Sequence, residues 1–389
     1  MNHRAKRRIV LAFCTMLTAT SVAAQPAARD VDIHAFDGVT LKATYYSPGK
    51  PGPGVMLFHM CNSTRKAWAG LGEKLASRGF HVLALDYRGY GDSGDQRSEN
   101  RDELFAIVNA LWPGDIDAAL ALLTAQTGVD RERLGAVGAD CGVHQAVQLA
   151  RRHREVKTLV LLAGDTDWAG EEFLAATPGM PLLGSASADD GAAVEEMKWL
   201  LGFSAFPKNR MIEYPRGGLG TEMFAVRADL EPTIVDWLDE HLVKHPASLV
   251  PPSTMPPAGP SAALFASLRS EGGATKLREA LRAARIGGEA VRVPPEGIVN
   301  ALGYEFLQEG KHKEAIQLFL LNVDARPRSA NALDSLSDAY LADGQTALAA
   351  EVCQKALKAL ESDPNKGELY QKTVRDAAEA KLKKLRKEP

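Results

Sequence analysis

The chain has 389 residues, more than one average domain holds, and 45% of them are hydrophobic, enough for ordinary globular cores. Its formal net charge is −3. A mildly acidic chain lacks the electrostatic footprint of a nucleic-acid-binding protein, so we expect two folded domains and no nucleic-acid partner.

Residues 1–24 have the pattern of a secretory signal peptide. A positive segment from Arg4 to Arg8 precedes the apolar stretch 9–22, and Val22-Ala23-Ala24 fits a small-residue cleavage site before Gln25. The apolar stretch is too short for a transmembrane helix. The pattern therefore predicts export to the periplasm or the medium, with no stable membrane anchor after cleavage.

Residues 25–245 alternate predicted strands and helices. Strands are expected twice within 31–46, around an Asp37-Gly38 turn, and then at 54–59, 81–86, 134–138, 158–163, 182–187 and near 210–214. Helices are expected at 66–78, 101–111, 113–127, 143–150 and 229–244. Such alternation predicts an α/β domain with a mostly parallel sheet covered by helices on both faces.

A proline-rich segment follows, with six prolines within residues 246–260. Proline removes backbone donors and fixes φ, so this segment is expected to be a semi-rigid linker between two domains.

Residues 261–389 contain an internal repeat with a period of about 34 residues, aligned when Glu296 is placed on Ala330. The first copy has Leu302, Gly303, Phe306, Gly310, Ala315, Phe319 and Pro327 where a tetratricopeptide repeat (TPR) needs large, small, aromatic, turn and stop residues. Leu336, Ser337, Tyr340, Gly344, Ala349, Cys353 and Ala356 follow in the second copy. The repeat predicts an all-α domain, with an earlier helix pair at 261–286 and a capping helix at 368–387. Two copies are few for independent stability, so packing against neighbouring helices or the first domain is expected.

The segment Gly138-Ala-Asp-Cys-Gly142 lies between a predicted strand and a predicted helix. A small-x-nucleophile-x-small turn at this place is the nucleophile elbow of α/β hydrolases. Its central residue is Asp140, where esterases carry Ser.

Residues 30–245 resemble the dienelactone-hydrolase-like branch of the α/β hydrolases. The resemblance is carried by the elbow and by Leu57-Phe-His-Met-Cys-Asn62, Asp86-Tyr-Arg-Gly-Tyr-Gly-Asp-Ser93 and Ser187-Ala-Asp-Asp190. It implies an α/β-hydrolase fold and a small ester or lactone as ligand, with no cofactor and no metal. With the repeats, the chain looks like an exported hydrolase–TPR fusion, and the repeats offer a surface for a protein partner.

The resemblance also implies where the active-site residues lie. Asp140 stands at the nucleophile position, and the oxyanion hole is expected from backbone N–H groups of Cys141 and of Met60 or Cys61. The triad acid is expected at Asp189, with Asp190 as the second choice.

The catalytic His is expected where Leu219 stands. The histidines after Asp190 are His241, His245 and His312, and the first two lie on the closing helix and at the linker, the third in a repeat. Without Ser and His, acyl transfer loses both its nucleophile and its base, so impaired catalysis is expected.

Two alternatives to an impaired hydrolase stay open. Asp140 or Cys141 could act as nucleophile in an active hydrolase with a recruited base such as His59. The simpler interpretation of His59 is a hydrogen-bonded loop residue. Alternatively, the repeats are the working module and the first domain is their scaffold.

Two expectations concern the surroundings of Asp140. Cys61 and Cys141 belong to the two loops that should meet at the active site, so they are the pair able to form a disulfide in an exported protein, the alternative being simple packing. Asp140 and Asp189 are expected to share the floor of the pocket. Like charges raise a pKa, so Asp140 should be partly protonated or should pair with a cation or with backbone donors.

Overall fold

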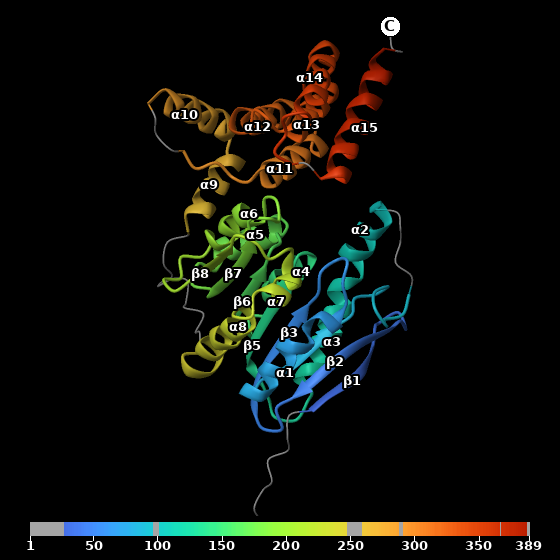
Figure 1. Ribbon diagram of the computed structural model, residues 1–389, viewed down its shortest axis with the longest axis vertical. Coiled ribbons are helices and arrows are strands. Elements are labelled where there is room, and N and C mark those ends of the chain that lie inside the picture. The colour runs from blue at the N-terminus through green and yellow to red at the C-terminus, as the bar shows by residue number, and fades with distance from the viewer. Residues whose placement is uncertain (1–26, 96–100, 247–258, 288–290, 366, 387–389) are drawn as a thin grey trace, which may run out of the picture.

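The computed structural model describes residues 27–95, 101–246, 259–287, 291–365 and 367–386 (Figure 1). The predicted signal peptide and most of the predicted linker lie outside the described residues. No helix of the described residues combines the length and the hydropathy needed to cross a membrane.

The first domain is built on one twisted sheet of mostly parallel strands. The strands are β1 (Ala27–His34), β2 (Thr40–Ser47), β3 (Gly52–Phe58), β4 (His81–Leu85), β5 (Val129–Ala139), β6 (Val156–Leu162), β7 (Leu182–Ser187) and β8 (Arg210–Tyr214). Their order across the sheet is β1-β2-β4-β3-β5-β6-β7-β8. β2 runs antiparallel to β1 and β4, and the other pairs are parallel. The predicted α/β architecture is confirmed.

Hydrophobicity explains the places of these strands in the sheet. Every residue of β3 and β4 is buried, as expected for central strands covered on both faces. The end of β1 alternates exposed and buried residues, which suits an edge strand with one solvated face.

Helices cover both faces of the sheet. α1 (Ala69–Arg78) and α8 (Leu230–Asp239) lie on one face, and α3 (Trp112–Thr124) and α4 (Cys141–Arg152) on the other (Figure 1). The remaining helical segments of this domain are η1 (Arg65–Trp68), α2 (Arg101–Ala110), α5 (Trp168–Ala176), α6 (Ala193–Leu201), η2 (Gly220–Glu222), α7 (Met223–Val226) and the π-helical turn η3 (Glu240–Lys244). α5 and α6 were not predicted, because nine residues are too few for a clear helical period.

The second part of the chain, here called the helical domain, comprises residues 260–386. Its helices are α9 (Pro260–Arg269), α10 (Gly273–Gly287), α11 (Glu296–Gln308), α12 (His312–Ala325), α13 (Ala330–Ala342), α14 (Thr346–Ala359) and α15 (Glu368–Leu385). The pairs α11–α12 and α13–α14 occupy the two predicted copies of the repeat. Gly303 lies where a Cβ atom would come within 2.5 Å of the Phe319 ring, so the repeat pattern needs its small residue there. Cys353 is buried and free, in agreement with a packing role.

The two domains share part of one hydrophobic core. Phe265 of α9 stacks on Trp168 of α5 with ring centroids 5.0 Å apart, and its other neighbour is Phe203 at 5.7 Å. Ala262 and Ile298 of the helical domain also belong to the core cluster of the first domain. The expected packing of the helices against the first domain is therefore found.

Replacing Phe265 by Ala should weaken this junction strongly, because Phe265 is only 4% exposed. Large-to-small changes of this kind cost about 3–5 kcal/mol. Urea denaturation followed by tryptophan fluorescence measures the loss. Phe36→Ala is the matched control, since Phe36 is 77% exposed, and its effect should stay within about 0.5 kcal/mol. Equal stability of the two variants would contradict a shared core.

Candidate active site

The elbow around Asp140 has the strained backbone that its sequence predicts. Asp140 has φ 51° and ψ −120°, a left-handed conformation rarely adopted by residues other than glycine. A Cβ atom on Gly138 would lie 2.0 Å from the carbonyl oxygen of Gly142, and one on Gly142 would lie 2.1 Å from that of Phe58. Both glycines are thus required for the turn, which raises Asp140 between β5 and α4.

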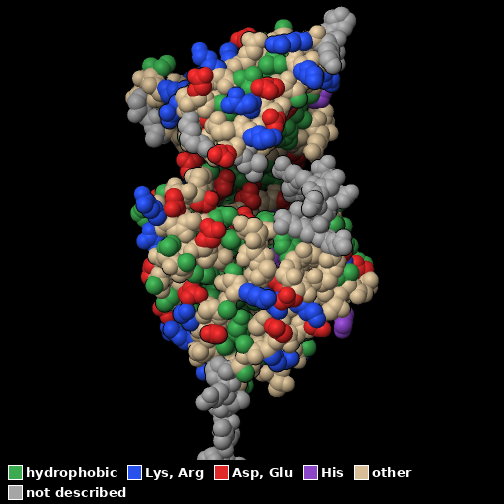
Figure 2. Space-filling view, turned by 45° about the vertical axis from the view of Figure 1, so that its right-hand side comes forward, with side chains coloured by type: hydrophobic (Ala, Val, Ile, Leu, Met, Phe, Trp, Pro, Cys, Tyr) green, Lys and Arg blue, Asp and Glu red, His purple; other side chains and the backbone are tan. Residues whose placement is uncertain are grey.

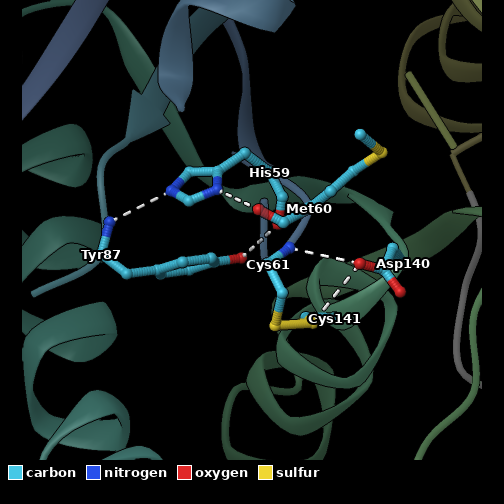
Figure 3. The surroundings of a disulfide bond; sticks show 6 residues. All are labelled: His59, Met60, Cys61, Tyr87, Asp140 and Cys141. Carbon is cyan, nitrogen blue, oxygen red and sulfur yellow. Dashed lines mark hydrogen bonds between the residues drawn. A yellow bond between two sulfur atoms is a disulfide. The ribbon is translucent and has the colours of Figure 1, made fainter. Parts of the chain in front are cut away.

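A disulfide joins Cys61, on the loop after β3, to Cys141, the first residue of α4 (Figure 3). Their Cα atoms are 5.5 Å apart, a usual separation for a disulfide. Of the two alternatives left open for these cysteines, a bridge or simple packing, the bridge is the one present. In this state Cys141 has no free thiolate, which removes it as a nucleophile.

The carboxylate of Asp140 points at the loop after β3. Its Oδ2 accepts a hydrogen bond from the backbone N–H of Cys61 at 3.2 Å (Figure 3). The sulfur of Cys141 lies 3.5 Å from the same oxygen, but a disulfide sulfur carries no proton to donate. Within the described part of the chain Asp140 forms no ion pair. Of the expected arrangements for Asp140, pairing with a backbone donor is the one found.

His59 is fully buried and both of its ring nitrogens are engaged. Nδ1 lies 2.6 Å from the carbonyl oxygen of Met60, and Nε2 accepts from the backbone N–H of Tyr87 at 3.3 Å. A neutral ring protonated on Nδ1 satisfies both contacts, and burial lowers the pKa of His59. The Tyr87 hydroxyl also donates to the carbonyl oxygen of His59 at 3.2 Å. His59 therefore anchors the loop that carries Met60 and Cys61. Because both of its ring nitrogens are hydrogen-bonded, it has no free lone pair with which to act as a general base.

Asp189 lies on the turn after β7 and faces the next loop. Its carboxylate accepts hydrogen bonds from the backbone N–H of Gly217, at 3.1 and 3.3 Å, and of Gly218, at 3.3 Å. A hydrogen bond from Ser187 and these backbone donors hold the pKa of Asp189 below its usual range. The expected triad acid thus binds the backbone of the loop in which the His was expected.

Leu219 stands on that same loop, half-buried against the core of the first domain. The loop touches the elbow, since a Cβ atom on the neighbouring Gly220 would lie 2.7 Å from the sulfur of Met60 and 3.1 Å from Ala139 Cβ. Position 219 is therefore at the site, and its side chain cannot accept a proton.

The later histidines are engaged elsewhere. His241 packs against Trp237 in a tilted arrangement, with ring centroids 4.2 Å apart. His245 pairs with Glu240 at 3.1 Å. His312 is the first residue of α12 in the helical domain.

Comparison with known proteins agrees with the topology of the sheet. Residues 53–185 match the family model described as the alpha/beta hydrolase fold. The first domain has an α/β-hydrolase fold. It is called the hydrolase domain below, for residues 27–246.

Two curated proteins of Mycobacterium tuberculosis, both described as uncharacterised, are 33% identical over 127 residues, or 32% of this chain. The match spans 42% of their own length. Similar solved structures include an esterase of Pyrococcus furiosus, 17% identical over 56% of this chain and 92% of that one, with a TM-score of 0.43. A dienelactone hydrolase of Anabaena variabilis is 18% identical over 56% and 100%, with a TM-score of 0.44.

Further carboxyl groups surround Asp140 in the hydrolase domain. Desolvation raises the pKa of Asp165 and of Asp190, and the charge of Asp140 raises both further. Burial, with the charges of Asp165 and Asp190, raises the pKa of Glu196 to about 7. The charge of Asp140 therefore acts on two neighbouring acids, Asp165 and Asp190.

Asp165 and Glu196 were not singled out from the sequence. Asp165 follows the end of β6, which neighbours β5 in the sheet, and carboxyl ends of adjacent parallel strands meet at one edge. That rule could have identified Asp165. Glu196 lies on α6, a helix that was not predicted.

A cavity of about 890 Å³ lies between the two domains, next to the acid turn. One wall is formed by Ala188, Asp189, Gly191, Ala192 and Glu195 of the hydrolase domain, and the other by residues of the helical domain around 325–331 and 363–370. Figure 2 shows acidic side chains gathered along the furrow between the domains. The helical domain thus covers the edge of the sheet at which the site lies (Figure 1).

Glu171 of α5 is a buried acid near this junction. Its Oε1 accepts from the Trp199 indole N–H at 2.7 Å, while its Oε2 has no hydrogen-bond partner among the described residues. Burial raises the pKa of Glu171 to about 8, from an ordinary 4.5. The folded protein therefore keeps a proton that the unfolded chain releases above about pH 4.5.

Glu171 should make the protein less stable as pH rises from about 5 to 8, because the stability given by the protonated form is lost through that window. Glu171→Gln keeps the acceptor for Trp199 and should flatten this part of the profile. Urea denaturation at pH values from 5 to 9 measures the free energy of unfolding of each variant. Glu172→Gln, at an exposed neighbouring position, is the control. A profile that falls as steeply in Glu171→Gln would contradict the assignment.

Proposed function

We propose that this chain is an exported α/β-hydrolase-fold protein, with TPR-like helices, that binds a small ester or lactone but does not hydrolyse it through a triad. The observation that carries the proposal is the hydrogen bond from the Cys61 N–H to the Asp140 carboxylate. An anion of the protein itself uses the donor that the reacting oxyanion would need.

The loss of catalysis has three physical causes in this proposal. One oxyanion-hole donor contributes about 3 kcal/mol toward the transition state, and Asp140 occupies that donor in the resting protein. A carboxylate at the nucleophile position forms an ester that water must then cleave with the help of a base. Leu219, which stands where the base is expected, has no group that accepts a proton.

The charges of the site restrict which class of ligand can bind. Burial and the charge of Asp140 raise the pKa of Asp165 and of Asp190, so a carboxylate ligand would add a further like charge to this region. A neutral or cationic ester or lactone is therefore the class that fits. We expect the ligand to enter through the cavity between the domains. The helical domain is the candidate surface for a protein partner.

Binding without turnover is tested on the mature protein. Isothermal titration with dihydrocoumarin, a neutral lactone, should give binding, while the same lactone with an added carboxylate should bind at least about tenfold more weakly. Release of p-nitrophenol from p-nitrophenyl acetate should match buffer alone. Turnover by the wild-type protein that is lost in the Asp140→Asn variant would contradict the proposal.

Export is supported by the disulfide, since such bonds persist in oxidising compartments. Expression with the full leader, followed by periplasmic fractionation and N-terminal sequencing, should give a mature chain that begins at Gln25. A cytoplasmic chain with an intact N-terminus would contradict this part.

A further inference from the structure

The disulfide and the elbow bring together three groups that can bind a metal once the sulfurs are reduced. The sulfurs of Cys61 and Cys141 and a carboxylate oxygen of Asp140 all lie within 4.8 Å of one another. All three residues are partly exposed, so both a reductant and an ion can reach them.

Their spacing matches a tetrahedral site. Zinc binds thiolate sulfur at about 2.3 Å and carboxylate oxygen at about 2.0 Å, which places a tetrahedral O···S pair about 3.5 Å apart. Asp140 Oδ2 and Cys141 Sγ are already 3.5 Å apart. Two sulfurs on one zinc are about 3.8 Å apart. With Cα atoms 5.5 Å apart, the two reduced side chains reach that separation by rotation about their χ bonds.

Charge favours a cation in the reduced site. Asp140 has no ion-pair partner among the described residues, and Asp165 and Asp190 are acidic neighbours. Thiolates are normally stabilised by a nearby positive charge. Here two thiolates would add to an acidic region, so a divalent cation is the partner that offsets them.

We propose that reduction of the Cys61–Cys141 disulfide by a dithiol converts this place into a site for a soft divalent cation such as Zn²⁺. The ligands are Cys61 Sγ, Cys141 Sγ and Asp140 Oδ2, with a fourth position left for water. Three protein ligands plus an open position is the pattern of catalytic rather than structural zinc. The proposal does not depend on ester binding by the oxidised protein.

The redox step is balanced. The dithiol gives two electrons and two protons to the S–S bond and becomes a disulfide, while the protein gains two thiols. Metal binding then releases the two thiol protons to solvent, since thiolate is the ligand form.

Co²⁺ is the probe, with the mature full-length chain. The protein is reduced with dithiothreitol, desalted without oxygen and titrated with Co²⁺. We expect one equivalent to give sulfur-to-cobalt charge-transfer bands and tetrahedral d–d bands, both removed by Zn²⁺. The oxidised protein should give neither, and the reduced Cys353→Ser variant should behave as wild type because Cys353 is buried in the helical domain.

Single-residue variants test the contributions of Asp140 and Cys61 to metal binding. Asp140→Asn should weaken Co²⁺ binding at least about tenfold while keeping the charge-transfer bands. Cys61→Ser should lose most of those bands. As an independent readout, Zn²⁺ should slow the alkylation of two thiols by iodoacetamide in the reduced protein. Absent bands in the reduced wild type, unchanged bands in Cys61→Ser, or unchanged affinity in Asp140→Asn would each overturn the assignment.

Discussion

Asp140→Ser combined with Leu219→His should give the chain an esterase activity that, in our proposal, it lacks. The elbow conformation, the bridged loops and Asp189 are all in place, and only the nucleophile and base are replaced. Ser at 140 also frees the Cys61 N–H for the oxyanion, a donor whose removal costs enzymes about 10²–10³-fold. Asp189 already contacts the loop that carries position 219.

The measurement is kcat/KM for p-nitrophenyl acetate. Triad members act as a unit, so each single variant should stay near background and the double variant should exceed both by at least about 10²-fold. Asp140→Ser with Leu219→Gln is the matched control, because Gln is polar but is no base. A folded double variant that is no faster than this control would show that the frame around Asp140 cannot support acyl transfer.

The second large effect is expected from the disulfide. Cys61 and Cys141 are 80 residues apart in sequence, and closing a loop of that length stabilises a protein by about 4–5 kcal/mol in the chain-entropy model. Cys61→Ser with Cys141→Ser should lower the free energy of unfolding by roughly this amount.

Tryptophan fluorescence during urea denaturation reports this loss, because all five tryptophans lie in the hydrolase domain. The reductant provides an internal control. Dithiothreitol should bring the wild type down to the stability of the double variant and should leave that variant unchanged. Equal stability of oxidised and reduced wild type would mean that the bridge does not constrain the unfolded chain.

Local patterns predicted much of the fold and part of the site. The apolar runs that became β3 and β4 and the 34-residue repeat were readable because each depends on residues close in sequence. The same holds for the elbow, where Gly138 and Gly142 leave no room for side chains. The small helices α5 and α6 were missed because short helices owe their stability to tertiary packing.

The environment of each site residue could not be predicted from the sequence. His59 could be a base or a loop anchor until the Tyr87 N–H and the Met60 carbonyl were found on its two ring nitrogens. Likewise, Asp189 and Asp190 are adjacent and chemically identical. A hydrogen bond from Ser187, with the N–H groups of Gly217 and Gly218, lowers the pKa of Asp189, whereas burial and then the charge of Asp140 raise the pKa of Asp190.

By itself the sequence determined the α/β-hydrolase architecture and the elbow, and it led to the expectation that Asp140 and Leu219 stand at the positions of nucleophile and base. These follow from hydrophobic period, glycine sterics and residue identity. The tertiary structure alone decided that the Asp140 carboxylate binds the Cys61 N–H, 79 positions away, and that the helical domain faces the turn of Asp189 across a cavity. Such contacts depend on how β3 and β5 pair and on how α9 packs against α5, and distances across a fold are not encoded in any local pattern.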